Sequence, residues 1–354
     1  MKKRKSSIAL ALVLALGLVG CGKTANNAGN NAKVEGNTDL KVGFVTDEGG
    51  INDQSFNQGV WEGLTKAKED FGINADYIES KDANAYKQNL ETLLDNDNEV
   101  IIGAGFKMGD AIVEEAKANP DVKYAIVDVD PEGAADNLMG IMFKQEEPSF
   151  LVGYIAGLTT ETDKVGFVGG QESTVIWGFE YGYKAGVEYA AKELGKEIQV
   201  SSQYIGGFSD VQKAKAISTQ MYQQGADVIF HAAGGGGDGV IEAAKEQGKW
   251  AIGVDRDQSE MAPENVLTSA MKNANVAVYD LVQSLVEGKD FAGGTTIYLG
   301  LKEQGAVGIA PTSDKHIKKD VLEKVEEIEK QIIDEKIVVP YDEETFEKFA
   351  AELK

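Results

Sequence analysis

The sequence is poor in the side chains that most often bind metals or form crosslinks. It has one cysteine, Cys21, and two histidines, His231 and His316, among 354 residues. A single cysteine cannot form an internal disulfide, and zinc sites are built mainly from several Cys and His side chains. We therefore expect no metal and no other cofactor.

Motifs for nucleotide hydrolysis and for serine hydrolases are also missing. The chain contains neither a GxxxxGK[ST] phosphate loop nor a G-x-S-x-G nucleophile elbow. Nucleotide hydrolysis would have to take place in another subunit. We expect the chain to be a binding protein and not an enzyme.

Positive charge is scarce. Against 58 acidic residues there are 35 basic ones, so the formal net charge is −23 at pH 7. A negative field repels phosphates unless a local basic cluster opposes it, and no such cluster is visible beyond the first residues. This balance argues against nucleic acid as a partner and against a strongly anionic ligand.

The first residues predict export and anchoring. Four basic residues precede a twelve-residue apolar run, Ile8 to Val19, which is too short to span a bilayer as a helix of about 20 residues. The run ends in "LVGC", which resembles the lipobox of bacterial lipoproteins. We expect a signal peptide over residues 1–20, a lipid on Cys21, and a location on the extracytoplasmic face of the cell membrane.

Residues 21–39 are small and polar, and we expect them to form a flexible tether. About 315 residues follow, more than one hydrophobic core usually serves. Short β-branched segments alternate there with longer helical patterns, which favours an α/β fold with parallel sheets.

The α/β pattern occurs twice. "KVGFV" begins at Lys41 and again at Lys164, and two further pairs of strand-like segments keep the same order at offsets of about 123 to 128 residues. We predict two doubly wound lobes, with residues 40–145 and 271–303 in the first and 146–270 and 304–354 in the second. Hinges are expected near Gln145, Ala270 and Glu303.

Open α/β sheets bind ligands beyond the carboxyl ends of their strands, so the loops after strands are the candidate site. After the first strand come Asp47, Asn52, Asp53 and Phe56, and either Asp53 or Ser55 is expected to cap the helix that follows. Phe56 is a lone aromatic among polar residues at a strand end. Its ring suits a flat ligand, with plain core packing as the alternative.

Acids also end the later strands. Asp128 and Asp130 end one apolar run and Asp255 ends its counterpart in the second half, where a carboxylate can accept two hydroxyl donors of a vicinal diol. Lys272 follows the next strand and could balance Asp255, with a solvated lysine as the alternative.

Gly234 and Gly235 follow the strand before the one that ends in Asp255, and they would let the backbone approach a ligand closely. Three glycines in this run, Gly234, Gly236 and Gly239, fit G-x-G-x-x-G, so an NAD-binding oxidoreductase is a rival interpretation. The match lies in the middle of its lobe and the chain carries an export signal, both of which weigh against this rival. Among aromatic side chains near strand ends, Phe106, Trp177 and Phe179 are further candidates.

Together, the lipobox and the segments "DQSFNQGVWEG", "AIVD", "GFEYGYKAG", "HAAGGGGDG", "GVDRDQ" and "TSAMKN" resemble the basic membrane protein family. These are nucleoside-binding lipoproteins of ABC transporters, like purine nucleoside receptor A. The resemblance covers nearly the whole chain from Cys21, and its most specific parts are "SFN" and "GVDxDQ".

The resemblance implies a type I periplasmic-binding-protein fold that captures nucleosides, purines first among them, for an ABC permease. It implies that Phe56 stacks on the base, that Asp47 and Asp128 bind base or ribose, and that Asp255 with Lys272 holds the ribose hydroxyls. The loop 234–237 would approach the ribose, and Trp177 is our expectation for a second stacking aromatic. Relatives tend to have a second acid beside Asp53 where this chain has Asn52.

Two other functions stay open on the same sequence. One is a receptor for a sugar or small signal on the same fold, since aromatic rings also stack on pyranoses. The other is a surface adhesin or antigen without a solute. In each case a tethered monomer is expected.

Overall fold

The computed structural model describes residues 39–353 of the chain. The predicted signal peptide, the lipidation site Cys21 and all but the last residue of the predicted tether lie outside the described residues. No helix among the described residues is long and apolar enough to cross a membrane.

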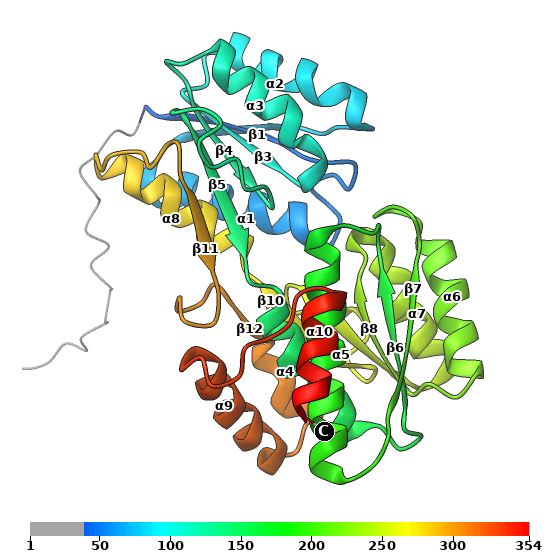
Figure 1. Ribbon diagram of the computed structural model, residues 1–354. Helices are drawn as coiled ribbons and strands as arrows, with labels where there is room; N and C mark the ends of the chain where they lie inside the picture. Colours follow the sequence, from blue (N-terminus) through cyan, green and yellow to red (C-terminus); the bar gives the residue numbers. More distant parts are fainter. Residues whose placement is uncertain (1–38, 354) are drawn as a thin grey trace, which may run out of the picture. The chain divides into compact units, whose positions relative to one another are not determined.

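The first of two sheets has the strand order β2-β1-β3-β4-β5-β11, and all its strand pairs are parallel. Its strands are β1 (Lys41–Val45), β2 (Asn74–Ile78), β3 (Val100–Ala104), β4 (Lys123–Val127), β5 (Leu138–Phe143) and β11 (Thr296–Leu299). Its helices are α1 (Phe56–Phe71), α2 (Tyr86–Asp95), α3 (Gly109–Ala118) and α8 (Ala274–Val286), with the short 3-10 helices η1 (Ala83–Ala85) and η2 (Phe106–Met108). We call this sheet with its helices the first lobe (Figure 1).

The second sheet repeats the same winding, in the order β7-β6-β8-β9-β10-β12. Its strands are β6 (Lys164–Gly169), β7 (Gln199–Tyr204), β8 (Val228–Ala232), β9 (Trp250–Asp255), β10 (Val266–Lys272) and β12 (Val307–Ile309), of which only β12 is antiparallel to its neighbour among the described pairs.

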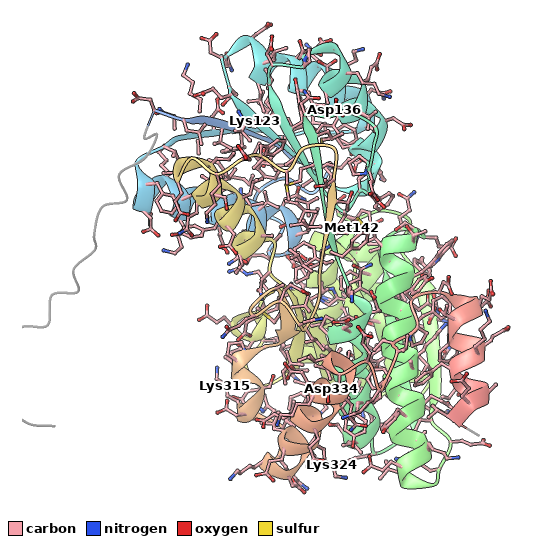
Figure 2. All side chains as sticks on the ribbon, turned by 60° about the vertical axis from the view of Figure 1, so that its left-hand side comes forward. Lys123, Asp136, Met142, Lys315, Lys324 and Asp334 are labelled. Atoms are coloured by element: carbon pink, nitrogen blue, oxygen red, sulfur yellow. The ribbon has the colours of Figure 1, made fainter. Side chains whose placement is uncertain are left out.

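The second lobe consists of this sheet and its helices. They are α4 (Glu146–Thr159), α5 (Thr174–Leu194), α6 (Val211–Gln223), α7 (Gly237–Gln247), α9 (Lys319–Ile333) and α10 (Glu343–Leu353), with η3 (Gly234–Gly236), η4 (Ser259–Met261) and η5 (Pro311–Lys315). In Figure 2, Lys123 and Asp136 mark the first lobe, Lys315, Lys324 and Asp334 mark the second, and Met142 lies between them near the end of β5.

Burial explains why these segments are central strands. All five residues of β3 and all five of β8 are buried, as expected for parallel strands covered by helices on both faces. In the second lobe, α4 and α5 approach so closely that a Cβ atom on Gly153 would lie 2.2 Å from the carbonyl oxygen of Tyr183. This contact fixes α5, whose first turns face the site described below.

The chain crosses between the sheets three times, between β5 and α4, between β10 and α8, and between β11 and β12. The two doubly wound sheets confirm the predicted fold class. The crossings lie close to the predicted hinges, although β10 continues to Lys272 and so places residues 271 and 272 in the second sheet. Motion about these crossings stays a prediction.

Candidate ligand-binding site

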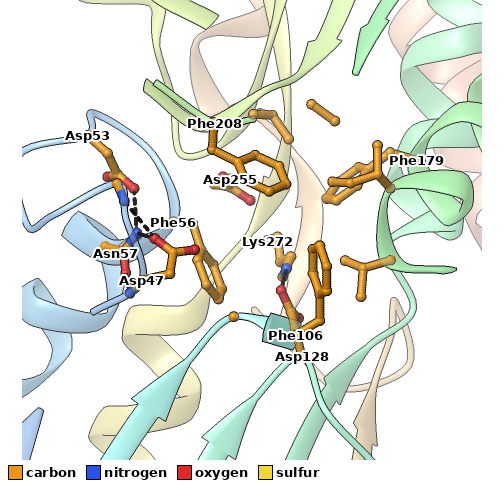
Figure 3. A pocket seen from close by; sticks show the side chains of 17 residues that line it. Asp47, Asp53, Phe56, Asn57, Phe106, Asp128, Phe179, Phe208, Asp255 and Lys272 are labelled. Carbon is orange, nitrogen blue, oxygen red and sulfur yellow. Dashed lines mark hydrogen bonds and ion pairs between the residues drawn. The ribbon is translucent and has the colours of Figure 1, made fainter. Parts of the chain in front are cut away.

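A cavity lies between the carboxyl ends of the two sheets, with about 530 Å³ of space free of protein atoms, part of it open to solvent. Four phenylalanines line it, Phe56 and Phe106 from the first lobe and Phe179 and Phe208 from the second (Figure 3). Its polar lining includes Asp47, Asp53, Asn57, Asp128, Asp255 and Lys272. The cavity therefore combines flat apolar faces with an excess of acids.

Asp53 organises the start of α1. Its carboxylate accepts hydrogen bonds from the backbone N–H groups of Ser55 (2.9 Å), Asn57 (2.9 Å) and Gln58 (3.1 Å). These are donors that the first turn of a helix leaves unpaired, so Asp53 is the capping residue. The Ser55 side chain makes no capping bond. Of the two expected caps, the structure thus selects Asp53.

Asn57 connects two of the acids. Its Nδ2 donates to Asp47 Oδ1 at 2.7 Å and to Asp53 Oδ2 at 3.0 Å, while its Oδ1 accepts from the Asp47 backbone N–H at 3.2 Å. The Gly49 N–H also donates to Asp47 Oδ1, at 2.8 Å. Burial nevertheless raises the pKa of Asp47 to about 6, because the hydrogen bonds only partly offset the loss of water around the charge.

Asp128 and Lys272 form an ion pair between the lobes. Lys272 Nζ lies 2.5 Å from Asp128 Oδ2, and the two side chains are only 2% and 6% exposed. The same ammonium lies 4.5 Å from the centre of the Phe56 ring, within the range of a cation–π contact. Asp128 Oδ1 is buried without a hydrogen-bond partner in the described structure, so one acceptor in this pair is unused.

Asp255 occupies the corresponding strand end of the second lobe. Its Oδ2 accepts a hydrogen bond from the Ser55 hydroxyl of the first lobe. Burial raises the pKa of Asp255 to about 6, against the lowering effects of Lys272 and Ser55. Asp128 and Asp255 share a left-handed backbone, with φ of 68° and 65°. Both carboxylates are thus held at a sharp turn at the carboxyl end of a strand, Asp128 just after β4 and Asp255 as the last residue of β9.

Phe208 comes from the loop after β7 and completes the aromatic lining. Its ring centre lies 6.1 Å from that of Phe106, with the planes at 74°. Gly234, with φ of 54°, permits this position, since a Cβ atom there would lie 3.2 Å from Phe208 Cβ. The glycine thus allows the close approach of an aromatic side chain.

A family model described as "ABC transporter substrate-binding protein PnrA-like" matches residues 40–343. The chain belongs to this family. It is a family of solute-binding proteins and not of enzymes, so a ligand and a transporter permease are the partners it implies, together with an extracytoplasmic place at the membrane. The predicted membership of the basic membrane protein family is confirmed.

Individual relatives agree with this assignment. The chain is 42% identical to the CD4+ T-cell-stimulating antigen of Listeria monocytogenes, covering 96% of this chain and 99% of that protein. It is 40% identical to basic membrane protein A of Borreliella burgdorferi, over 88% and 91% of the two chains. Among solved structures, an ABC transporter solute-binding protein from Aeropyrum pernix matches with a TM-score of 0.80 and 28% identity, over 89% of this chain and 97% of that one.

Most of the predicted site residues come together. Asp47, Asp53, Phe56, Asp128, Gly234, Asp255 and Lys272 all line the one cavity, although they are spread over more than 220 residues of sequence. Lys272 is buried against Asp128 and is not a solvated lysine. Asp130 bonds instead with Thr296 and Tyr298 at an exposed place on the first lobe.

Three predicted residues lie elsewhere. Asn52 is exposed and Gly235 does not contribute to the lining, although its neighbour Gly234 does. Trp177 corrects our expectation for a second stacking aromatic, because it is 37% exposed and lies with Tyr181 and several acids in a different surface hollow. Helix α5 begins after the Ser173 cap, and its helical turn presents Val175, Ile176 and Phe179 to the cavity while Trp177 points away.

Among the polar and aromatic side chains of the lining, two were missed. Asn57 is buried in the first turn of an amphipathic helix, beside two acids, and that position could have marked it. Phe208 follows a strand just as Phe56 does, so the same search for lone aromatics at strand ends would have found it. Among the described residues, no group of three or more His, Cys, Asp or Glu side chains is arranged to hold a metal.

Proposed function

We propose that the chain is a lipid-anchored protein that captures nucleosides, purine nucleosides first among them, and delivers them to an ABC importer. One observation carries this proposal: aromatic rings from both lobes and carboxylates with unused acceptor capacity line the same cavity. A nucleoside has the matching parts, a flat base and a pentose rich in hydroxyl donors.

The aromatic side chains support binding of the base. Phe56 and Phe106 belong to one lobe and Phe179 and Phe208 to the other, so a flat heterocycle can be held between rings of opposing lobes. We assign the two stacking roles to Phe56, at the start of α1, and Phe208, in the loop after β7, one from each lobe. Stacking of a base on an aromatic ring contributes about 1–3 kcal/mol and depends little on the identity of the base.

The acids support binding of the sugar. Asp128 Oδ1 is buried without a partner, and a buried acceptor gains most from a ligand donor. Among the described residues, the Ser55 hydroxyl is the hydrogen-bond donor to Asp255, which leaves its other oxygen for a ribose hydroxyl. We assign the ribose to Asp255 and Lys272, with Asp47 and Asp128 bonding to base or ribose.

The charge of the cavity argues for a neutral ligand. Four aspartates and one lysine line it, and the lysine is already paired with Asp128. A phosphate group would therefore face unpaired carboxylates in a partly buried site, where repulsion is strong. Nucleosides should bind and nucleotides should not.

The transport role follows from the two lobes and from the predicted anchor. A ligand that touches both lobes favours their closed arrangement, by a hinge motion at the three crossings. We propose that the two lobes move as the two bodies, with residues 271 and 272 moving with the second sheet rather than with 273–303. The lipid on Cys21 and the tether to residue 39 would hold a monomer on the extracytoplasmic face of the membrane.

Calorimetry tests the proposal directly. Adenosine, guanosine and inosine should bind. Cytidine is included as the pyrimidine nucleoside for comparison with these purine nucleosides, and adenosine monophosphate should not bind measurably. Tighter binding of free ribose than of any nucleoside would favour the sugar receptor instead. A lack of thermal protection by every nucleoside would favour an antigen without a solute, because a ligand that binds only the folded state must raise stability.

A further inference from the structure

Gln258 ends the "GVDRDQ" segment after β9, and the proposed ligand contacts do not use it. The residue is 2% exposed and does not line the cavity. Its side chain nevertheless makes hydrogen bonds in both lobes. A buried amide needs a partner for each of its groups, and both groups of this amide have one.

The orientation of the Gln258 amide is determined by its neighbours. The Val254 backbone N–H donates to Gln258 Oε1 at 2.9 Å, and since that group can only donate, the atom it faces must be the oxygen. His231 Nε2 lies 3.0 Å from the same oxygen and must therefore carry a proton. Complete burial lowers the pKa of His231 to about 4, so its ring is neutral at neutral pH.

The second lobe is shaped to hold this side chain. A Cβ atom on Gly253 would lie only 2.5 Å from Gln258 Oε1 and 2.4 Å from Ser269 Oγ, so a larger residue there would displace both. The Ser269 hydroxyl in turn accepts from the Gln258 backbone N–H at 3.1 Å. Contacts from β8, β9 and β10 thus hold the Gln258 side chain in one position.

The remaining group of the amide reaches the first lobe. Gln258 Nε2 donates to the backbone oxygen of Gln54 at 3.0 Å. Gln54 has a left-handed backbone, with φ of 53°, and stands between the cap Asp53 and Ser55, two residues before the cavity residue Phe56. The bond therefore holds the short segment that presents these side chains to the ligand.

Other contacts between the lobes differ from this one. The Ser55–Asp255 bond and the Asp128–Lys272 pair involve cavity side chains, for which ligand hydroxyls compete. The Arg256–Glu62 pair, at 3.3 Å, is 33% and 43% exposed, and such pairs contribute little. Among these residues, Gln258 makes a part-buried contact outside the cavity lining, which a bound ligand leaves intact.

We propose that Gln258 is a positioning residue that links the lobes independently of the ligand and sets the fraction of molecules ready to bind. Only the class of ligand used as a probe rests on the proposed function. The apparent Kd is the intrinsic Kd divided by the fraction of competent molecules. Loss of the bond should thus weaken the binding of every ligand by the same factor.

The variant Gln258→Glu tests this. Glutamate keeps an acceptor for Val254 and His231 but loses the donor to the Gln54 carbonyl. We expect the affinities for adenosine, guanosine and inosine all to fall by up to about tenfold, the size expected for the loss of one hydrogen bond. Gln247→Glu, the same change at an exposed site on α7, is the control and should change nothing. Unchanged affinity, or factors that differ between ligands, would refute the inference.

Hydrogen exchange on the ligand-free full chain gives a second readout. The amides of residues 52–58 should exchange faster in Gln258→Glu than in the wild type, while those of α9 should not change. Unchanged exchange at 52–58 would overturn the inference whatever the ligand. Faster exchange in a protein that binds no nucleoside would overturn the proposed function alone. If the glutamate prevents folding, the uncharged Gln258→Met replaces it under the same criteria.

Discussion

The two lobes share one winding but contribute different chemistry to the cavity. Both sheets run in the strand order second, first, third, fourth and fifth, and each places an aspartate with a left-handed backbone at the carboxyl end of its fourth strand. After the first strand, however, the first lobe has Asp47 where the second has Gly170. After the third strand, Phe106 corresponds to Gly234.

This difference indicates how a repeated fold forms an asymmetric site. The first lobe supplies two phenylalanines and three of the four acids, while the second supplies Lys272, Asp255 and a glycine that leaves room for Phe208. Parallel strands end at the same edge of each sheet, so duplication brings two sets of loops together. The residues on those loops then decide what is bound.

The largest effect, on the free energy of unfolding, is expected at one of the two aspartates that end the fourth strands, Asp128 and Asp255. Asp128→Asn keeps the shape and tolerates the left-handed backbone, but it leaves the buried Lys272 ammonium without its counter-ion. We expect a loss of about 3 kcal/mol in the free energy of unfolding, measured by urea denaturation. The double variant with Lys272→Met should recover most of that loss. Asp255→Asn should cost much less, and equal losses at the two sites would contradict this account of the lobes.

The second effect concerns the aromatic side chains of opposing lobes. Phe56→Ala and Phe208→Ala should each weaken nucleoside binding by about 1–3 kcal/mol, because each removes one stacking face. Titration calorimetry measures both, and Trp177→Ala is a matched control outside the cavity. Wild-type affinity in Phe208→Ala would show that Phe208 contributes no stacking.

The third prediction compares the acids across pH. Because the pKa values of Asp47 and Asp255 are both raised to about 6, lowering the pH from 8 to 5 should protonate them and weaken ribonucleoside binding, by up to about tenfold per unit for each group. Calorimetry at several pH values on Asp47→Asn and Asp255→Asn should show that each variant loses part of this dependence. A profile flat from pH 8 to 5 would contradict the assignment.

The same shifts have the opposite effect on the ligand-free protein. A folded-state pKa above the unfolded value means that the native protein binds protons first as the pH falls. The contribution of these two groups to stability is therefore lowest above pH 6 and increases as the pH falls from about 6 to about 4. Thermal unfolding of Asp255→Asn should show a smaller gain over that range than the wild type.

The smallest effect is expected at Gly234, which holds the position in the second lobe that Phe106 holds in the first. Gly234→Ala puts a Cβ atom 3.2 Å from Phe208 Cβ and strains a backbone with φ of 54°. We expect about 1 kcal/mol of lost stability and a severalfold weaker affinity, by thermal unfolding and calorimetry. Phe106→Ala, the matched change in the first lobe, should introduce no backbone strain. Any destabilisation that it causes would therefore have another origin than an unfavourable φ.

Much of this protein could be predicted from the sequence. Alternation of apolar strands and helices, repeated at a nearly constant offset, predicted both sheets because buried parallel strands require that pattern. The rule that ligands bind beyond strand ends selected Asp47, Phe56, Asp128 and Asp255. Each of them now lines the cavity.

The tertiary structure decided which side chains face each other. Helical phase turned Trp177 away, and the packing of the second lobe brought Phe208 in beside Gly234. The pairing of Lys272 with Asp128, and the bond from Gln258 to Gln54, join residues 144 and 204 positions apart. Periodicity along a chain tells which residues are buried, whereas contacts between lobes depend on how the two sheets and their helices meet.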